Sequence, residues 1–419
     1  MPRPLACLLL ACAVAAMGCA RPPRWVVSPE PTREEVEILL ETGGASQLPR
    51  NAITVHEIPD IPVREHLRPC CAFGSELRAS LDGLIPIPWY RIPNVLGPGD
   101  LGPHTYDSGV FTARSDGRVS AGFDAERNGL VYTCRGGFID TAHVRDYVDW
   151  AIYFAAQIGR LSETGGEIAL PDEGGSRRVR VRPLPAKIVD RYGLRASVTT
   201  LAQFIAFEVS IWHEIATWYG WSSLKAFPER ASAFSPEDLY SNMLGSKLML
   251  AITAKGLAGS EPEYDRAVDG WFARALELLG AVPRELGNEV TRSLDGLWWD
   301  SRHRLPDPAL VQRRNFAIGD PIRPWLAPES ALPDGVRRAL AEACGGAPAP
   351  VVFANPARVP GVELGDLTTL EIEVDDSLAQ QEPFATRGRH LTQRDFPQIV
   401  AVVRAQALVE FGSRADRPD

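Results

Sequence analysis

Two stretches of the chain combine histidines with carboxylates in mostly apolar and aromatic surroundings. Residues 134–150 contain His143, and residues 207–218 contain His213 followed directly by Glu214. In both stretches the apolar residues recur at helical spacing, which predicts two amphipathic or buried helices. Because buried imidazoles and carboxylates need partners, these positions are the candidates for chemistry.

The second stretch partly matches the zinc-protease pattern His-Glu-x-x-His, in which two histidines one helical turn apart bind zinc and the glutamate activates water. His213 and Glu214 fit the first half, but position 217 is Thr217. The motif is therefore broken, which argues against a standard site of that class. The His-Glu pair also occurs at His56-Glu57, in a loop-like stretch, so the pair alone is a weak signal.

A variant metal site is the leading hypothesis. It takes His143 and His213 from different helices as ligands, completed by Asp146 or Glu237, with Glu214 as the base. Three protein ligands with an open position are typical of catalytic zinc, so the cofactor would be zinc or another divalent metal and the protein a hydrolase. The alternative is that both histidines are core residues bonded to nearby carboxylates or carbonyl groups.

Cys134 supports a competing hypothesis. It precedes Arg135-Gly136-Gly137, where we expect a helix to begin, and both a helix start and a neighbouring cation lower the pKa of a thiol. With His104 upstream as base, the arrangement resembles that of permuted papain-like amidases and acyltransferases. The other reading makes Cys134 a buried thiol or half of a disulfide. A third hypothesis is a non-enzymatic envelope protein that binds a partner or ligand.

The N-terminus predicts export and a lipid anchor. Residues 5–16 form a short apolar run that is typical of a signal peptide and too short to span a bilayer. The run ends at Gly18-Cys19, which resembles the bacterial lipoprotein cleavage signal, so residues 1–18 would be removed and Cys19 would carry the lipid, palmitate included. Ala20 replaces the aspartate that signals inner-membrane retention, which favours the outer membrane, facing the periplasm.

Four further cysteines would then lie in an oxidising compartment, where disulfides are permitted. Adjacent Cys70 and Cys71 are not expected to bridge each other. One of them could bridge to Cys134 or Cys344, and spacing does not decide between these possibilities.

Composition sets the class of the protein. Of the 419 residues, 45% are hydrophobic and 23% charged, as in ordinary globular proteins, and 35 prolines and 36 glycines indicate long irregular segments. With a net charge of −9, the chain lacks the excess of basic residues by which proteins bind nucleic acid or anionic lipid.

We expect an α+β fold that is predominantly helical, with a helix-rich body, a small β-hairpin, an irregular N-terminal wrap and a C-terminal strand–helix appendage. The domain boundaries would be 1–18 for the signal peptide, 19–60 for a tether and docking segment, 61–345 for the main domain and 346–419 for the appendage. The periodicity predicts helices at 136–159, 198–218, 235–255, 263–279 and 285–299, a hairpin within 161–185, strands at 109–114, 129–133 and 367–374, and a terminal helix near 411.

Three segments carry a resemblance to a known family. Residues 68–74, 132–146 and 212–220 are similar to stretches of a family of uncharacterised bacterial lipoproteins that share a domain of unknown function. The resemblance spans residues 65–345. It implies an envelope location and one continuous domain, and it brings no substrate, cofactor or catalytic residue with it.

Overall fold

The computed structural model describes residues 30–41, 58–59, 61–63, 67–68, 73–81, 85–106, 126–223, 228–319, 321–346, 349–355, 358–359 and 362–419. Several predicted features lie outside these residues: the signal peptide at 1–18, Cys19, most of the tether segment, Cys70, Cys71 and the strand at 109–114.

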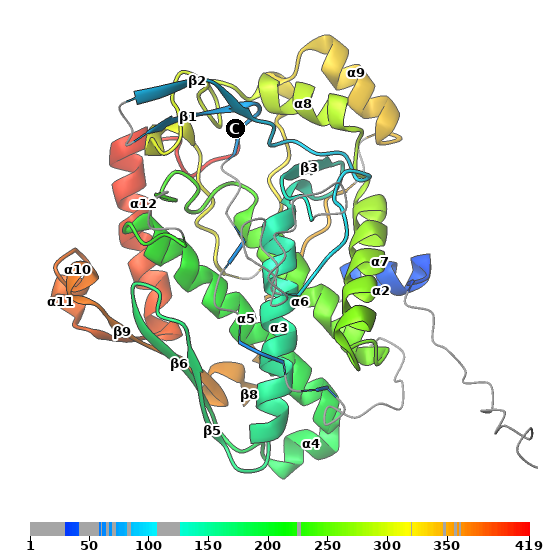
Figure 1. Cartoon of the computed structure of the whole chain (residues 1–419), viewed down its shortest axis with the longest axis vertical. Coiled ribbons are helices and arrows are strands. Elements are labelled where there is room, and N and C mark those ends of the chain that lie inside the picture. Colours follow the sequence, from blue (N-terminus) through cyan, green and yellow to red (C-terminus); the bar gives the residue numbers. More distant parts are fainter. Residues whose placement is uncertain are drawn as a thin grey trace, which may run out of the picture.

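Three helices form the centre of the molecule (Figure 1): α3 (Thr141–Leu161), α5 (Leu194–Trp218) and α6 (Asp238–Ala254). All of α6 is buried, and α5 is buried from Ser197 onward except at one position, as expected for helices with apolar residues on most faces. α3 and α6 pack backbone to backbone at Gly245, where a Cβ atom would collide with the carbonyl oxygen of Val144. This close packing brings the polar residues of the three helices into one region.

The start of α3 differs from the prediction. Gly136-Gly137 does not open the helix, because Gly137 adopts φ +65° in the turn between strands β3 (Leu130–Thr133) and β4 (Gly137–Asp140). The helix begins at Thr141, where the Asp140 carboxylate caps it by accepting from the amides of the second and third residues. The helix therefore starts with His143 in its first turn.

A four-stranded sheet lies beside these helices in the order β10-β9-β6-β5. The predicted hairpin is present as β5 (Gly166–Leu170) and β6 (Gly175–Val181). The C-terminal strand β9 (Thr368–Val374) forms as predicted and pairs along the whole of β6, and β10 (His390–Thr392) follows it. The C-terminal segment is thus built into the same sheet as the hairpin, and helix α12 (Phe396–Phe411) packs against α5.

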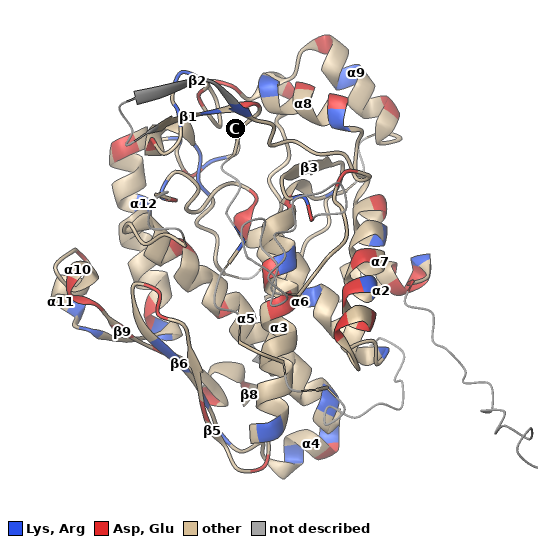
Figure 2. Cartoon of the chain, in the orientation of Figure 1, with Lys and Arg blue, Asp and Glu red and all other residues tan. Residues whose placement is uncertain are grey.

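The remaining elements surround this core. α7, α8 and α9 carry charges of both signs, whereas α5 is almost free of them (Figure 2). The predicted helix-rich α+β fold is confirmed. The helices and strands that surround the central core are α2 (Arg33–Glu41), β1 (Leu77–Leu81), β2 (Ile85–Ile92), α4 (Ala186–Tyr192), α7 (Glu261–Leu279), α8 (Arg284–Ser293), α9 (Asp334–Ala343), β7 (Arg358–Val359), β8 (Val362–Glu363), α10 (Asp376–Ala379) and α11 (Phe384–Arg387).

Among the described residues, every helix is too short or too polar to cross a lipid bilayer.

Candidate functional site

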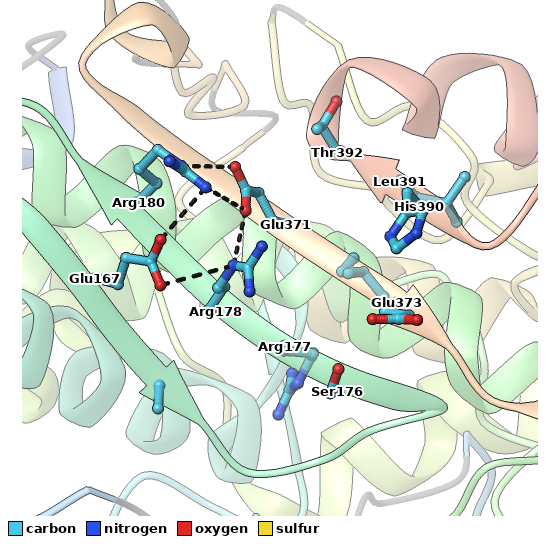
Figure 3. Close-up of a pocket in the computed structure, with 12 residues that line it drawn as sticks. Glu167, Ser176, Arg177, Arg178, Arg180, Glu371, Glu373, His390, Leu391 and Thr392 are labelled. Atoms are coloured by element: carbon cyan, nitrogen blue, oxygen red, sulfur yellow. Dashed lines mark hydrogen bonds and ion pairs between the residues drawn. The ribbon is translucent and has the colours of Figure 1, made fainter.

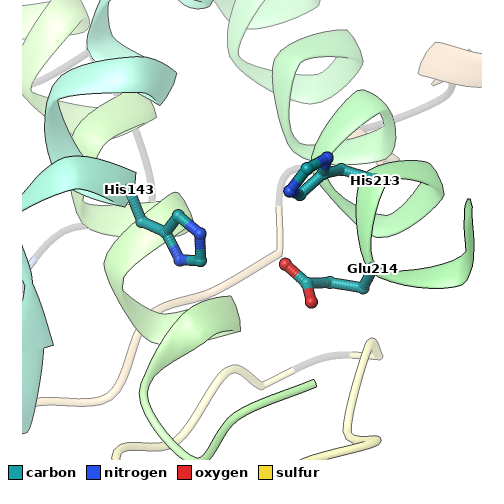
Figure 4. Close-up of side chains that lie close together, drawn as sticks. All are labelled: His143, His213 and Glu214. Carbon is teal, nitrogen blue, oxygen red and sulfur yellow. The ribbon is translucent and has the colours of Figure 1, made fainter. Parts of the chain in front are cut away.

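The two histidines singled out by the sequence meet between α3 and α5 (Figure 4). The ring centroids of His143 and His213 lie 6.3 Å apart, with the ring planes almost perpendicular. One donor atom from each ring and one carboxylate oxygen of Glu214 all lie within 4.8 Å of one another. The exposed fractions of the three residues are only 2%, 4% and 2%. A set of two imidazoles and one carboxylate is a recurring ligand set for catalytic zinc.

Glu173 orients His213. Its Oε1 lies 2.6 Å from Nδ1 of His213, and its backbone oxygen accepts from the indole N–H of Trp212. Burial lowers the pKa of His213, but the Glu173 carboxylate and then Glu214 outweigh this effect and raise it to about 9. Because Glu173 occupies Nδ1, Nε2 is the nitrogen left for a metal, which would bind there in place of the second proton.

Asp238 lies beside Nδ1 of His143. Nδ1 of His143 lies 3.1 Å from Oδ1 of Asp238. The other oxygen of Asp238 accepts from the amide of Ser235 at 2.6 Å, so the carboxylate is fixed at the start of α6. Both histidines therefore have a carboxylate at Nδ1, which is the arrangement that orients metal-binding histidines in many proteins.

The loop before α6 holds Glu214. Phe234 adopts φ +55°, which is rare for a residue with a bulky side chain. In this conformation its amide donates to Oε2 of Glu214 at 2.7 Å. Strained backbone of this kind concentrates at functional sites.

Asp140 is a further carboxylate beside His143, and Glu237 directly precedes Asp238 at the start of α6. Asp140, Glu237 and Asp238 are all buried, and an oxygen of Asp140 and one of Asp238 lie within 4.8 Å of each other and of a His143 nitrogen. Burial raises the pKa of Glu237, and the charges of Asp238 and Asp140 raise it further. Burial and the charge of Glu214 likewise raise the pKa of Asp238, against the opposing effect of His143. Acids in this state gain from a cation.

Tyr147 also faces the site from α3. It lies one turn after His143, and the two ring centroids are 6.4 Å apart. Burial, and then the charges of Glu173 and Glu214, raise the pKa of its hydroxyl group well above the usual value. The hydroxyl group has no hydrogen-bond partner among the described residues, so it is a donor that a ligand could use.

A comparison with protein families covers this whole region. A family model described as "Protein of unknown function (DUF4056)" matches residues 58–328. The chain belongs to the DUF4056 family. The match contains both histidines and all five of the surrounding carboxylates. No curated protein and no solved structure matches the chain.

Asp146 lies elsewhere in this DUF4056 protein, so its prediction as a ligand is corrected. Its carboxylate accepts from the backbone amide and the guanidinium of Arg68, at 3.0 Å and 2.8 Å. Arg68 also contacts Asp149 and Glu126 and is fully buried. Although Asp146 follows His143 by three residues, this arginine draws it into a separate buried network.

The pairing of Cys134 with His104 is also wrong. Cys134 forms a disulfide with Cys344, so it has no thiol to act as a nucleophile. It lies in the turn between β3 and β4 rather than at a helix start. Nε2 of His104 contacts Asp149 at 3.0 Å, within the Arg68 network. The structure thus contradicts the amidase or acyltransferase hypothesis.

A surface pocket is separate from the histidines. It has a volume of about 670 Å³ and lies on the sheet formed by β5, β6, β9 and β10 (Figure 3). Its arginines are paired: Arg178 and Arg180 both bond to Glu371, and Arg180 also contacts Glu167. None of the residues around His143 and His213 lines it.

Sequence reasoning missed Glu173, Asp140 and Asp238 as parts of the candidate site. Glu173 belongs to the hairpin turn, where an acidic residue is usually exposed. Asp140 and Asp238 precede or open helices, where an acid is ordinarily explained as a cap. For Asp140 and Asp238 a signal was present: each caps or opens a helix that also carries, or packs against, a candidate histidine.

Proposed function

We propose that this protein is a metal-dependent hydrolase whose cation is bound by His143, His213 and Glu214. The observation that carries the proposal is the convergence of two imidazoles and a carboxylate, with a second carboxylate beside Nδ1 of each imidazole. Ligands of one cation lie about 3–4 Å apart. Donor atoms within 4.8 Å of one another therefore need to approach by at most roughly 1–2 Å. In this proposal Glu214 is a ligand rather than the base.

The remaining groups support hydrolysis. Three protein ligands leave a coordination position for water, and a bound zinc-type ion lowers the pKa of that water. The Tyr147 ring lies 6.4 Å from the His143 ring, and its buried hydroxyl group would donate a hydrogen bond to substrate or water. Trp221 contacts the His213 ring at 5.6 Å between centroids and is only partly buried, so the approach from solvent would pass it.

Metal analysis of the purified mature protein tests the cation. We expect about one equivalent or more of a divalent metal, and loss of metal in His143→Ala and His213→Ala variants. His390→Ala is the matched control, because His390 is exposed on β10. A metal content near zero that is the same in the His213→Ala variant contradicts the proposal.

Activity requires a separate test. Generic chromogenic phosphoesters, carboxyl esters and peptide amides should be assayed as substrates. We expect the protein to hydrolyse at least one of them. That hydrolysis should stop on chelation, return when metal is restored and be absent in His213→Ala. Hydrolysis that persists unchanged in metal-free protein would remove this function.

A structural cation is the second candidate, and the burial of all three ligands favours it. The cation would then link α3 and α5 and stabilise the core, as structural zinc does. In that case chelation lowers the melting temperature while no substrate class is hydrolysed.

We further propose that the protein is a lipoprotein anchored to the envelope through Cys19, with the outer membrane as its location. The Gly18-Cys19 signal after an apolar run supports this, and so does the disulfide between Cys134 and Cys344, because disulfides persist in oxidising compartments. Labelling with a palmitate analogue should mark the wild type and Cys7→Ser but not Cys19→Ser. Label retained in Cys19→Ser contradicts the anchor.

A further inference from the structure

The loop at residues 231–235, just before α6, carries two backbone contacts to the candidate site. The amide of Phe234 donates to Oε2 of Glu214 at 2.7 Å, and the amide of Ser235 donates to Oδ2 of Asp238 at 2.6 Å. Phe234 has the rare φ of +55°, a conformation that persists only when surrounding contacts hold it. The groups that bind the other side of this loop therefore control where its amides point.

Arg314 binds the peptide group that contacts Glu214. A peptide group is planar and trans, so its carbonyl oxygen and its N–H point in opposite directions. The carbonyl group of Ala233 and the N–H of Phe234 belong to one such group. The guanidinium of Arg314 donates to its oxygen, and its N–H donates to Glu214. The hydrogen bonds thus run from a cation through one peptide group to a carboxylate, and each strengthens the other.

The next peptide group is held in the same way. The amide of Asn315 donates to the carbonyl oxygen of Phe234 at 2.8 Å, and the N–H on the opposite side of this group is that of Ser235, which binds Asp238. Arg314 also donates to the carbonyl oxygen of Ala231 at 3.3 Å. The segment at residues 314–315 therefore fixes two consecutive peptide groups of the loop.

Arg314 is itself fixed in the core. It is fully buried, and its guanidinium donates to two further backbone carbonyl groups, at 3.1 and 3.2 Å. The guanidinium lies 5.4 Å from the ring centroid of Trp218 and 4.9 Å from that of Phe411. Its backbone amide donates to the carbonyl oxygen of Ala415 at 2.7 Å. A guanidinium with these contacts is placed to support the loop and not to bind a substrate.

We propose that Arg314 is a positioning residue of the metal site, which holds the amide of Phe234 against Glu214. The inference rests on the proposed function, because Glu214 is a metal ligand only there. With Oε2 bound by the amide, Oε1 is the oxygen left for the cation. Oε1 is buried and has no hydrogen-bond partner within the described part of the chain. Loss of Arg314 frees the peptide group to turn, and the carboxylate then loses its fixed orientation.

The affinity of the mature protein for Zn²⁺, measured by competition with a chelator, tests the inference. We expect Arg314→Met to bind Zn²⁺ about 10-fold more weakly than wild type. Arg314→Lys should also bind more weakly, because one ammonium group cannot replace the guanidinium fork. Arg145→Met is the matched control and should bind as wild type does. Arg145 is equally buried, and its guanidinium donates to backbone carbonyl groups in another part of the chain.

The visible absorption of bound Co²⁺ gives a second measurement, because it reports ligand geometry. The spectrum of Arg314→Met should differ from that of wild type in the same way as the spectrum of Glu214→Ala. All measurements are made where circular dichroism shows folded protein, and Arg314→Lys carries the test if Arg314→Met does not fold.

Three outcomes would overturn the inference and leave the proposed function standing. The first is wild-type affinity and spectrum in Arg314→Met. The second is wild-type affinity in Arg314→Lys, which would show that charge alone suffices. The third is an equal loss of affinity in Arg145→Met, which would show that any buried arginine has this effect. A wild-type protein that binds no Zn²⁺ overturns the inference and the proposed function together.

Discussion

Glu173 and His213 are 40 positions apart in the chain, and Oε1 of Glu173 lies 2.6 Å from Nδ1 of His213. The contact joins the turn of the β5–β6 hairpin to the C-terminal part of the central helix α5. A surface hairpin therefore fixes which nitrogen of a core histidine faces His143 and Glu214.

Replacing Glu173 should weaken metal binding without removing a proposed ligand. We expect Glu173→Gln to lower the affinity about 10–100-fold, because the amide loses the charge that holds the proton on Nδ1. Competition with a chelator of known affinity measures the change. Glu167→Gln, on the exposed side of the same hairpin, is the control. Equal affinities in wild type and Glu173→Gln would mean that Glu173 serves the fold alone.

Arg68 should be essential to stability. Its guanidinium contacts Glu126, Asp146 and Asp149, all buried. Arg68→Met leaves these carboxylates without their cation, so we expect a loss of about 3–5 kcal/mol in the free energy of unfolding by urea. Arg91→Met breaks an exposed pair with Glu76 and should cost about 0–1 kcal/mol. Similar losses in the two variants would contradict the importance of the buried network.

The disulfide should stabilise the protein measurably. Cys134 and Cys344 are separated by 210 positions, so the bond constrains much of the unfolded chain. We expect Cys344→Ser to lower the free energy of unfolding in guanidinium chloride by about 2–4 kcal/mol. A reducing agent should lower the stability of wild type in the same way and leave the Cys134→Ser/Cys344→Ser double variant unchanged. Two titratable thiols at these positions in non-reduced protein would refute the bond.

Glu208 should make stability fall as pH rises. Burial raises its pKa to about 8 in the folded protein, against 4.5 as the ordinary value. Between these two pH values the unfolded chain has already lost the proton that the folded chain retains, so stability is fully present below pH 4.5 and decreases toward pH 8. Glu208→Gln should remove this decrease in the free energy of unfolding, which is on the order of a few kcal/mol.

Urea unfolding at pH 5 and pH 8.5 measures the effect. The variant should exceed wild type at the higher pH, and the difference should shrink or reverse at the lower one. Glu167→Gln, which alters an exposed carboxylate, should follow the wild-type pH profile. A Glu208→Gln profile parallel to wild type would show that Glu208 ionises normally.

Local sequence patterns determined the helices and the hairpin. The apolar periodicity around His143 and His213 predicted both central helices, because burial of an apolar face depends on residue spacing alone. The same patterns indicated that these two histidines are the residues to examine. The cap at Asp140 was missed because Gly136-Gly137 looked like a helix start, whereas pairing of β4 with β3 extends that segment.

Tertiary structure decided which polar groups meet. The sequence predicted Asp146 as a ligand and Glu214 as the base. Arg68 binds Asp146, while packing of α3 against α5 brings Glu214 close to both histidines. Glu173 and Asp238 reach their histidines across 40 and 95 positions, and no local pattern encodes such contacts. The sequence by itself established the helices and which of their residues are reactive types. Helix packing and strand pairing chose the partners, because contacts between distant segments depend on how the whole chain fills its core.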